Sequence, residues 1–312
     1  MKKLALEDYP LLKPYFYNQT YALCTYSLPS MIVWSNHVFQ TFYAMEKDSI
    51  IIANESKCRP EENHLLLPVI PHGLPTPEEL AALALQTGYR QYRSVPEDYL
   101  EQAGREKVGQ YFIVSEQPEY DDYVYLTEDL STLKGNRYAK KRNLIHQFSR
   151  DYLLPNRVVT GPITSAVIVE CLECLEKWCE IRNCDTDPDP NLACEKKAAI
   201  NALHHFTHLD MKGLYVRIDG EICAFCISSY LRRDMGVMNF EKALPHVRGL
   251  YQYLDNECAK QLFNGYQYIN KESDMGAPAL AKSKNSYHPV LKIKSYCLTL
   301  TGNPGGESIK PA

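Results

Sequence analysis

The sequence predicts an α+β fold in which two halves each combine a mixed, mostly antiparallel sheet with flanking helices. Each half contains one hairpin pattern, at 38–53 and at 214–229, and further strands alternate with helical patterns of period 3.6. This order indicates an antiparallel start with one crossover. The chain has 312 residues, of which 45% are hydrophobic and 23% charged. These are globular values, and the length suffices for two domains.

The first half contains a hairpin followed by a well-marked helix. Phe39, Thr41, Tyr43 and Met45 alternate with their neighbours, and a polar turn at 46–49 precedes the second strand. A capping box at 76–79, with proline at the first helical position, starts a helix that runs to about residue 86 and ends at Gly88. The other predicted elements are strands at 64–70, 91–93, 111–115 and 123–126 and a short helix at 96–103.

A basic linker helix over 137–152 closes the first half, and Pro162 then starts a long helix to about Arg182 in the second half. Asp219-Gly220 is a strong two-residue hairpin signal between strands at 214–218 and 221–229. The remaining predictions are helices at 192–208, 248–263 and 278–284 and strands at 236–242, 266–270 and 290–300. We therefore expect domains over 1–150 and 151–302, with a frayed tail over 303–312.

Composition and the N-terminal segment predict a compartment. The net charge is −4, which argues against a strongly electrostatic nucleic-acid binder but leaves room for a local basic groove. The sequence contains no run of eighteen apolar residues, so no membrane span is predicted. The apolar run at 4–6 stops at Glu7, which is too early for a signal peptide. The odd number of cysteines, 11, indicates reduced thiols. We expect a cytoplasmic protein.

Three spacings imitate metal sites without meeting their requirements, so no metal site is predicted. Two Cys-x-x-Cys pairs, at 171–174 and 223–226, lie within a helix and a strand rather than in turns. His204 and His208 lack the glutamate of a zinc-protease helix. The acidic run at 185–189 lacks the glycine and final glutamate of a calcium loop and indicates a solvated turn. No Walker loop, Rossmann glycine fingerprint or Gly-x-Ser-x-Gly elbow occurs.

Two segments suit a phosphate-bearing ligand. The basic segment at 133–143 places several cations on one short helix, which can grip phosphates or be a solvated linker. The loop at 243–249 leads from a strand into a helix N-terminus, where free backbone N–H groups, the helix dipole and Arg248 suit an anion. A capped helix start with nothing bound is the alternative for this loop.

The same basic segment resembles the signature of soluble proteins related to the C-terminal domain of lysyl-phosphatidylglycerol synthase. The run from Asn270 to Gly276, then Leu280 to Lys284 and Tyr287-His288-Pro289, resembles that family's acidic-glycine, lysine and aromatic-x-proline pattern. The similarity spans nearly the whole chain. It implies two tandem acyltransferase folds of the GNAT type, and transfer of an acyl or aminoacyl group to an amine or hydroxyl.

Two departures from related enzymes bear on the donor and the acceptor. Acyl-CoA enzymes of this superfamily carry Arg/Gln-x-x-Gly-x-Gly/Ala at the pyrophosphate turn, but this chain has His246 and Tyr251 at the outer positions. This difference favours another phosphate-bearing donor, such as aminoacyl-tRNA. The membrane domain of the lipid-modifying enzymes is not in the sequence, so the resemblance leaves the acceptor open. A CoA-dependent N-acetyltransferase and a non-catalytic, ligand-binding descendant remain alternatives, and no cofactor is required by the favoured reaction.

The candidate site residues follow the strand ends of the second half. The carboxylates of Glu241, Glu272 and Asp274 are the candidate bases, because each lies at or just beyond the end of a predicted strand. Tyr287 is the candidate acid for the leaving group. Candidates for the donor phosphate are His246, Arg248, Gly249, Lys282 and Lys284, and those for tRNA are Arg137, Lys140, Lys141 and Arg142. We expect the cleft between the strand that ends at Glu241 and the strand that ends near Asn270.

Overall fold

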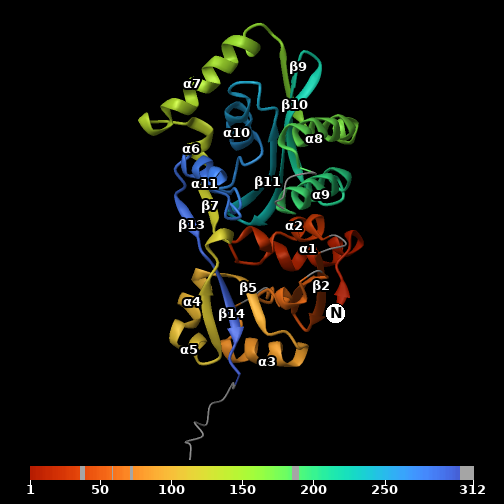
Figure 1. The fold of residues 1–312 in the computed structure, drawn as a ribbon, viewed down its shortest axis with the longest axis vertical. Helices are drawn as coiled ribbons and strands as arrows, with labels where there is room; N and C mark the ends of the chain where they lie inside the picture. The colour runs from red at the N-terminus through yellow and green to blue at the C-terminus, as the bar shows by residue number, and fades with distance from the viewer. Residues whose placement is uncertain (36–38, 58, 71–72, 185–189, 303–312) are drawn as a thin grey trace, which may run out of the picture.

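The structure is a computed structural model that describes residues 1–35, 39–57, 59–70, 73–184 and 190–302. Its strands form two seven-stranded sheets, one above the other in Figure 1. The first sheet consists, in spatial order, of β1 (Lys2–Lys3), β2 (Phe39–Glu46), β3 (Ser49–Ser56), β4 (His64–Leu65), β5 (Gln91–Pro96), β14 (Ser295–Leu300) and β6 (Phe112–Glu116). The second consists of β13 (Leu291–Ile293), β7 (Asp122–Leu126), β12 (Tyr268–Asn270), β11 (Met235–Ala243), β10 (Glu221–Arg232), β9 (Lys212–Ile218) and β8 (Val158–Pro162).

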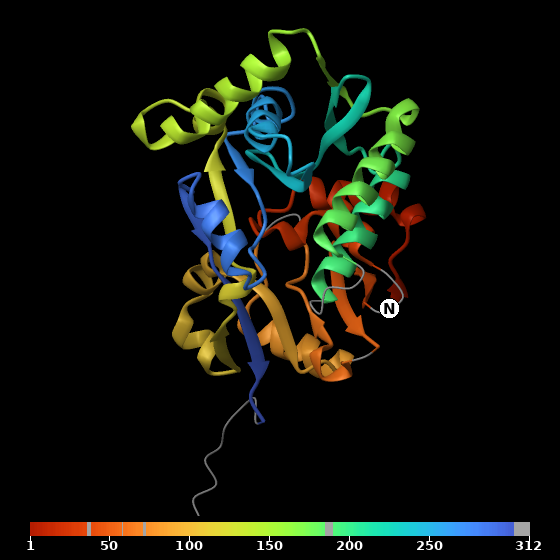
Figure 2. The same cartoon turned by 45° about the horizontal axis from the view of Figure 1, so that its top comes forward.

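Both sheets are mixed and mostly antiparallel, which confirms the predicted fold class. Each contains one parallel pair, β4 with β5 and β11 with β12. The helices are α1 (Tyr9–Tyr17), α2 (Leu28–Trp34), α3 (Pro77–Thr87), α4 (Glu97–Ala103), α5 (Arg105–Gly109), α6 (Thr127–Thr132), α7 (Ala139–Phe148), α8 (Ile168–Arg182), α9 (Pro190–His204), α10 (Leu250–Gln261) and α11 (Pro278–Asn285). Helices α1 and α2 lie between the sheets, and α10 covers the face of the second sheet opposite α8 and α9 (Figures 1 and 2).

The two sheets exchange strands across the expected boundary near residue 150. Strand β7 comes from the first half of the chain but pairs with β12 and β13 of the second sheet. Strand β14 comes from the end of the second half but lies between β5 and β6 of the first sheet. Each sheet therefore depends on both halves of the sequence, and the sheets do not divide at a single point along the chain.

The elements that short sequence signals predict are confirmed by the structure. Thr76 Oγ1 accepts a hydrogen bond from the Glu79 N–H (3.2 Å), Glu79 Oε2 accepts one from the Thr76 N–H (2.8 Å), and Gly88 ends the helix with φ of 79°. Asp219 and Gly220 both have positive φ, as a tight hairpin turn requires. The hairpin β2–β3 is confirmed over its described residues. The acidic loop at 185–189 and the tail at 303–312 lie outside the described residues.

Other elements differ from the expectation. The single strand expected at 290–300 is two strands, β13 and β14, which belong to different sheets. Val158–Pro162 is a strand where a helix start was expected at Pro162, and α9 ends at His204 rather than at residue 208. The basic helix breaks into a short 3-10 turn at 136–138, α7 itself and a π-helical turn at 149–153. Helices α1 and α2 were not predicted.

Tyrosine supplies much of the buried core. Tyr26, Tyr92 and Tyr99 are at most 1% exposed, and each hydroxyl donates to a backbone carbonyl oxygen, of Ser94 (3.1 Å), Leu80 (2.8 Å) and Pro75 (3.1 Å) respectively. A buried tyrosine whose hydroxyl is hydrogen-bonded leaves no polar group unsatisfied in the core. The ten cysteines that the structure describes are free thiols, and both Cys-x-x-Cys pairs are buried in the core. Within the described ranges, no helix combines the length and apolarity needed to cross a bilayer.

Candidate functional site

The second sheet opens between β11 and β12. These parallel strands pair only at Met235–Tyr268, Gly236–Ile269 and Val237–Asn270, after which β11 continues to Ala243 without β12 beside it. The chain after β12 instead stays with β7, since Lys271 N–H donates to Tyr123 O (2.9 Å) and Tyr123 N–H donates to Glu272 O (3.2 Å). The two strands are thus neighbours that separate, as expected. We call this opening the splay.

A β-bulge in β11 turns polar side chains to both faces of the sheet at the splay. Along β10, Ile227 faces Phe240 but Ser228 faces Met238, which leaves Asn239 as the extra residue. Asn239 Nδ2 donates to Ser30 Oγ of α2 (2.7 Å), whereas Glu241 contacts Lys271, which in turn contacts α10. Bulges commonly redirect side chains next to active sites.

On the α10 face, three charged side chains that are at most 16% exposed form a group with Tyr287. Lys271 Nζ donates to Glu241 Oε2 (3.1 Å) and to Asp255 Oδ1 (2.9 Å), and it lies 5.1 Å from the centroid of the Tyr287 ring. Lys141 of α7 lies over the same ring, with Nζ 3.5 Å from the centroid. We call these five residues the lysine cluster. Asp255 Oδ2 is buried without a hydrogen-bond partner.

Burial, together with one cation shared by two carboxylates, sets the protonation of the lysine cluster. Burial disfavours the charge of Lys271, but Asp255 and Glu241 outweigh it and hold the pKa of Lys271 well above its ordinary value. At Glu241 burial prevails over Lys271 and raises the pKa to about 7. Burial also lowers the pKa of Lys141 to about 8. The cluster therefore holds two groups that titrate near neutral pH, which active sites need for proton transfer.

On the α2 face, a second polar group surrounds Glu272. Glu272 Oε1 lies 3.4 Å from Asn239 Nδ2, and burial raises the pKa of Glu272 to about 8. Asn239 Oδ1 is buried without a partner. Below it, Asp122 accepts hydrogen bonds from the Cys24 N–H (2.5 Å) and from Asn270 Nδ2 (2.7 Å). These bonds fasten the segment before α2 to strands β7 and β12 of the second sheet.

Two of the expected site residues have structural roles instead. Asp274 accepts hydrogen bonds from the Tyr123 hydroxyl (2.5 Å) and from the Gly276 N–H (2.9 Å), which makes it the brace of a turn rather than a free base. Lys284 Nζ donates to the carbonyl oxygens of Lys271, Glu272 (3.0 Å) and Ser273 (2.6 Å). An ammonium group has three hydrogens, so Lys284 has none left for a donor phosphate. Lys282 is exposed on α11.

The turn expected to bind the donor phosphate is covered by α7. His246 and Arg248 are exposed, but Gly249 is buried at the start of α10 with φ of +83°. A Cβ atom there would lie 2.2 Å from the backbone oxygen of Leu144 and 3.1 Å from Phe148 Cβ, both in α7. The backbone of this turn therefore faces another helix, and its role as an open anion site is not supported.

The cations expected to hold tRNA differ in their surroundings. Arg137 donates to Asp129 Oδ2 (2.7 Å), and Arg142 donates to the carbonyl oxygens of Leu133 and Gly135. Lys141 points into the lysine cluster, whereas Lys140 is exposed. The structure thus engages three of the four side chains within the protein, and the helix does not present them as one continuous basic face.

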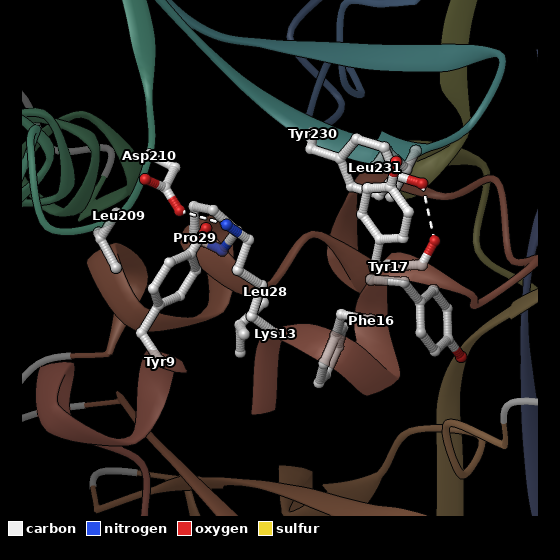
Figure 3. Close-up of a pocket in the computed structure, with 11 residues that line it drawn as sticks. Tyr9, Lys13, Phe16, Tyr17, Leu28, Pro29, Leu209, Asp210, Tyr230 and Leu231 are labelled. Carbon is white, nitrogen blue, oxygen red and sulfur yellow. Dashed lines mark hydrogen bonds and ion pairs between the residues drawn. The ribbon is translucent and has the colours of Figure 1, made fainter. Parts of the chain in front are cut away.

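Two pockets lie away from the splay. One, of about 180 Å³, lies among α1, α2 and β10, and the rings of Tyr9, Phe16 and Tyr230 line it (Figure 3). At its edge Lys13 Nζ contacts Asp210 Oδ2 at 2.6 Å. The other, of about 480 Å³, lies between the segment 17–20 and the β10–β11 turn at 232–234. Neither is lined by a residue of the lysine cluster.

Comparison with known proteins places the chain in a family. Residues 36–299 match the family described as phosphatidylglycerol lysyltransferase, C-terminal. The chain belongs to this family. The match covers most of the chain and includes the splay and the lysine cluster, and it confirms the resemblance seen in the sequence.

Two solved structures share the fold of this chain. It is similar over 96% of its length to 99% of a conserved protein of unknown function from Bacteroides thetaiotaomicron, with 28% identity and a TM-score of 0.85. It is also similar over 95% of its length to 92% of the C-terminal domain of a protein from Agrobacterium fabrum described as a putative lysylphosphatidylglycerol synthetase, with 12% identity and a TM-score of 0.63. An uncharacterized protein of Mycoplasmoides gallisepticum, MYCGA3080, is 28% identical over 179 residues, and the chain spans about half of its length, 54%.

Sequence reasoning missed two members of the lysine cluster in this family member. Lys271 lies within the motif at 270–276, but nothing in the sequence around it indicated a role. Asp255 had a recognisable signal, because Tyr251, Asp255 and Cys258 follow one face of α10 at spacings of four and three, and Leu262 continues this face just after the helix. A carboxylate on an apolar helical face is buried and must find a cation or a proton.

Replacing Glu272 by glutamine is expected to stabilise the protein at alkaline pH. The pKa of Glu272 is raised from 4.5 to about 8 by burial, so its contribution to stability is complete below pH 4.5 and is lost as pH rises to 8. A glutamine side chain has no proton to lose in this range. We expect Glu272→Gln to raise the free energy of unfolding by about 1–3 kcal/mol at pH 8 and by less at pH 5.

Urea denaturation of both proteins at several pH values measures this difference. Glu128→Gln is the matched control, since the Glu128 side chain is 81% exposed and its removal should give no such pH-dependent gain. A difference between Glu272→Gln and the wild type that does not grow with pH would contradict the protonated state of Glu272.

Proposed function

We propose that this chain is an aminoacyltransferase that moves an aminoacyl group from aminoacyl-tRNA to an amine or hydroxyl acceptor at the splay. The family and the fold support a transferase of the acyl type. The observation that carries the proposal is the lysine cluster, where Glu241 titrates near neutral pH beside an opened strand edge. Glu241 is the candidate carboxylate whose surroundings best match a general base.

The other two candidate bases fit less well. Asp274 is occupied by Tyr123 and a turn N–H, and Glu272 lies on the opposite face, where its proton is held up to about pH 8. Glu241 is therefore the proposed base, with backbone N–H groups of the unpaired part of β11 as donors to the developing oxyanion. The acceptor loses its proton to Glu241 as its nitrogen or oxygen attacks the ester carbonyl carbon.

The covered turn at Gly249 favours aminoacyl-tRNA over CoA as the donor. A pyrophosphate needs open backbone N–H groups at the helix start, and α7 packs on that position. Lys140, exposed on α7, and Arg248, exposed beside the turn, remain the proposed contacts for an RNA backbone.

Transfer assays with competing donors test the proposal. Purified protein is incubated with radiolabelled lysyl-tRNA or acetyl-CoA, and with phosphatidylglycerol vesicles or small amines and alcohols as acceptors. We expect transfer from the tRNA ester only, and a loss of about 10²–10⁴-fold in rate for Glu241→Gln. Transfer from acetyl-CoA alone would favour an N-acetyltransferase, and transfer from neither donor would favour a ligand-binding descendant.

A further inference from the structure

Lys141 lies at the point where the basic helix meets the lysine cluster. The close contact of Gly249 with Leu144 seats α7 on the start of α10, which brings Lys141 Nζ to 3.5 Å from the centroid of the Tyr287 ring. Lys141 Nζ also donates to Ser286 Oγ at 2.7 Å. Unlike Arg137 and Arg142, it contacts the cluster rather than the helix's own surroundings.

We infer that Lys141 is the proton donor to the leaving oxygen of the donor ester, the role for which the sequence suggested Tyr287. This inference rests on the proposed aminoacyl transfer and assigns the residue that completes it. Tyr287 becomes the platform that holds the ammonium group through its ring, a contact that arises from the negative face of the aromatic system.

The charged groups around Lys141 support this assignment. Asp255 of α10, Glu241 of β11 and Lys271 after β12 act on Lys141, and burial is the largest influence on it, lowering its pKa to about 8. Burial raises the pKa of Tyr287 well above its ordinary value. At neutral pH the Lys141 ammonium therefore gives up a proton far more readily than the Tyr287 hydroxyl.

The proton balance closes within the cluster. The acceptor forms a bond to the carbonyl carbon and passes its proton to the Glu241 carboxylate, and the carbonyl electrons move onto the oxyanion. When the tetrahedral intermediate collapses, the bond between the carbonyl carbon and the ribose oxygen breaks, and that oxygen takes a proton from the Lys141 ammonium. Proton transfer from Glu241 to the neutral Lys141 amine restores both groups.

This pairing predicts a bell-shaped pH profile for kcat/KM. Glu241 acts only when ionised, above pH about 7, and Lys141 acts only when protonated, below pH about 8. The rate with an aminoacyl-tRNA donor should therefore be highest between these values and fall on either side.

The test compares two donors of the same amino acid, the tRNA ester and a 4-nitrophenyl ester whose leaving group needs no proton. Lys141→Arg keeps a cation over Tyr287 but cannot release a proton near neutral pH. We expect it to lower kcat about 10²–10⁴-fold with the tRNA ester, to lose less than about tenfold with the activated ester, and to lack the alkaline limb. Lys141→Met serves as a second variant, and Lys260→Arg, exposed on α10, is the matched control.

The outcomes separate the two proposals. If the wild type transfers from the tRNA ester but Lys141→Arg keeps its rate and alkaline limb, Lys141 is not the acid. An equal loss with both donors would make Lys141 a positioning residue and overturn the inference as well. Loss of the alkaline limb in Tyr287→Phe instead would return the role to Tyr287. No transfer by the wild type from the tRNA ester overturns the proposed function itself.

Discussion

Replacing Lys271 by methionine is expected to lower the free energy of unfolding by about 3–5 kcal/mol. Lys271 is 12% exposed, and its partners Glu241 and Asp255 are 16% and 3% exposed. Methionine would fill a similar volume but leave both carboxyl groups without their cation. Breaking a buried ion pair from one side is costly because the remaining charge has no water to solvate it. Urea denaturation at pH 8 measures the effect.

A charge-neutral background separates this cause from lost packing. In Lys271→Met combined with Glu241→Gln and Asp255→Asn, no buried charge remains among these three side chains, and we expect most of the lost stability to return. Lys260→Met, which removes an exposed partner of Glu257, should cost less than about 1 kcal/mol. A Lys271→Met protein as stable as the wild type would show that the cluster does not hold the charges assigned to it.

Gly249→Ala is expected to lower the free energy of unfolding by about 3 kcal/mol or more. The positive φ of +83° accounts for about 1–2 kcal/mol of this loss. The rest comes from the contact of the new Cβ with the Leu144 oxygen, which would be only 2.2 Å away. Since both atoms belong to helices or their ends, relief requires α7 to move away from α10. Denaturation and hydrogen exchange of the α7 amides measure the two consequences.

Gly265→Ala is the matched control. Gly265 also has a positive φ, +99°, but nothing lies within 4 Å of a Cβ there. It should show the conformational cost alone, with the α7 amides as protected as in the wild type. Equal losses of stability for the two variants would contradict the close packing of α7 on α10.

The sequence predicted those parts of the fold whose determinants are local. The capping box at Thr76, the Asp219-Gly220 turn and the alternating strands of the two hairpins each carry their signal within a few residues. The split of 290–300 into β13 and β14 could not be found in this way. Both pieces are extended, and only pairing with β7 on one side and with β5 and β6 on the other assigns them to different sheets.

The candidate site was predicted at the level of strands rather than side chains. The resemblance implied a fold in which β11 and β12 are neighbours that separate. This expectation placed Glu241 at the splay. The role of Asp274 did not follow, because the Tyr123 hydroxyl that occupies it comes from a distant segment. The role of Lys284 did not follow either, because its partners are backbone carbonyls of residues 271–273, and their placement depends on how the chain turns after β12. Lys141 was a candidate for tRNA binding because of its charge. Only the packing of α7 shows that this charge lies over the Tyr287 ring.

The position of β14 between β5 and β6 constrains how the protein can be made on the ribosome. Translation produces β5 and β6 first, and Ser295–Leu300 emerges only after all of the second sheet's strands. Until then the nascent chain carries two strand edges whose shared neighbour does not yet exist, and such edges are prone to pair wrongly. The sheet whose strands are mostly synthesised first is therefore completed last. The time between the synthesis of β6 and that of β14 is the period in which a chaperone would protect the chain.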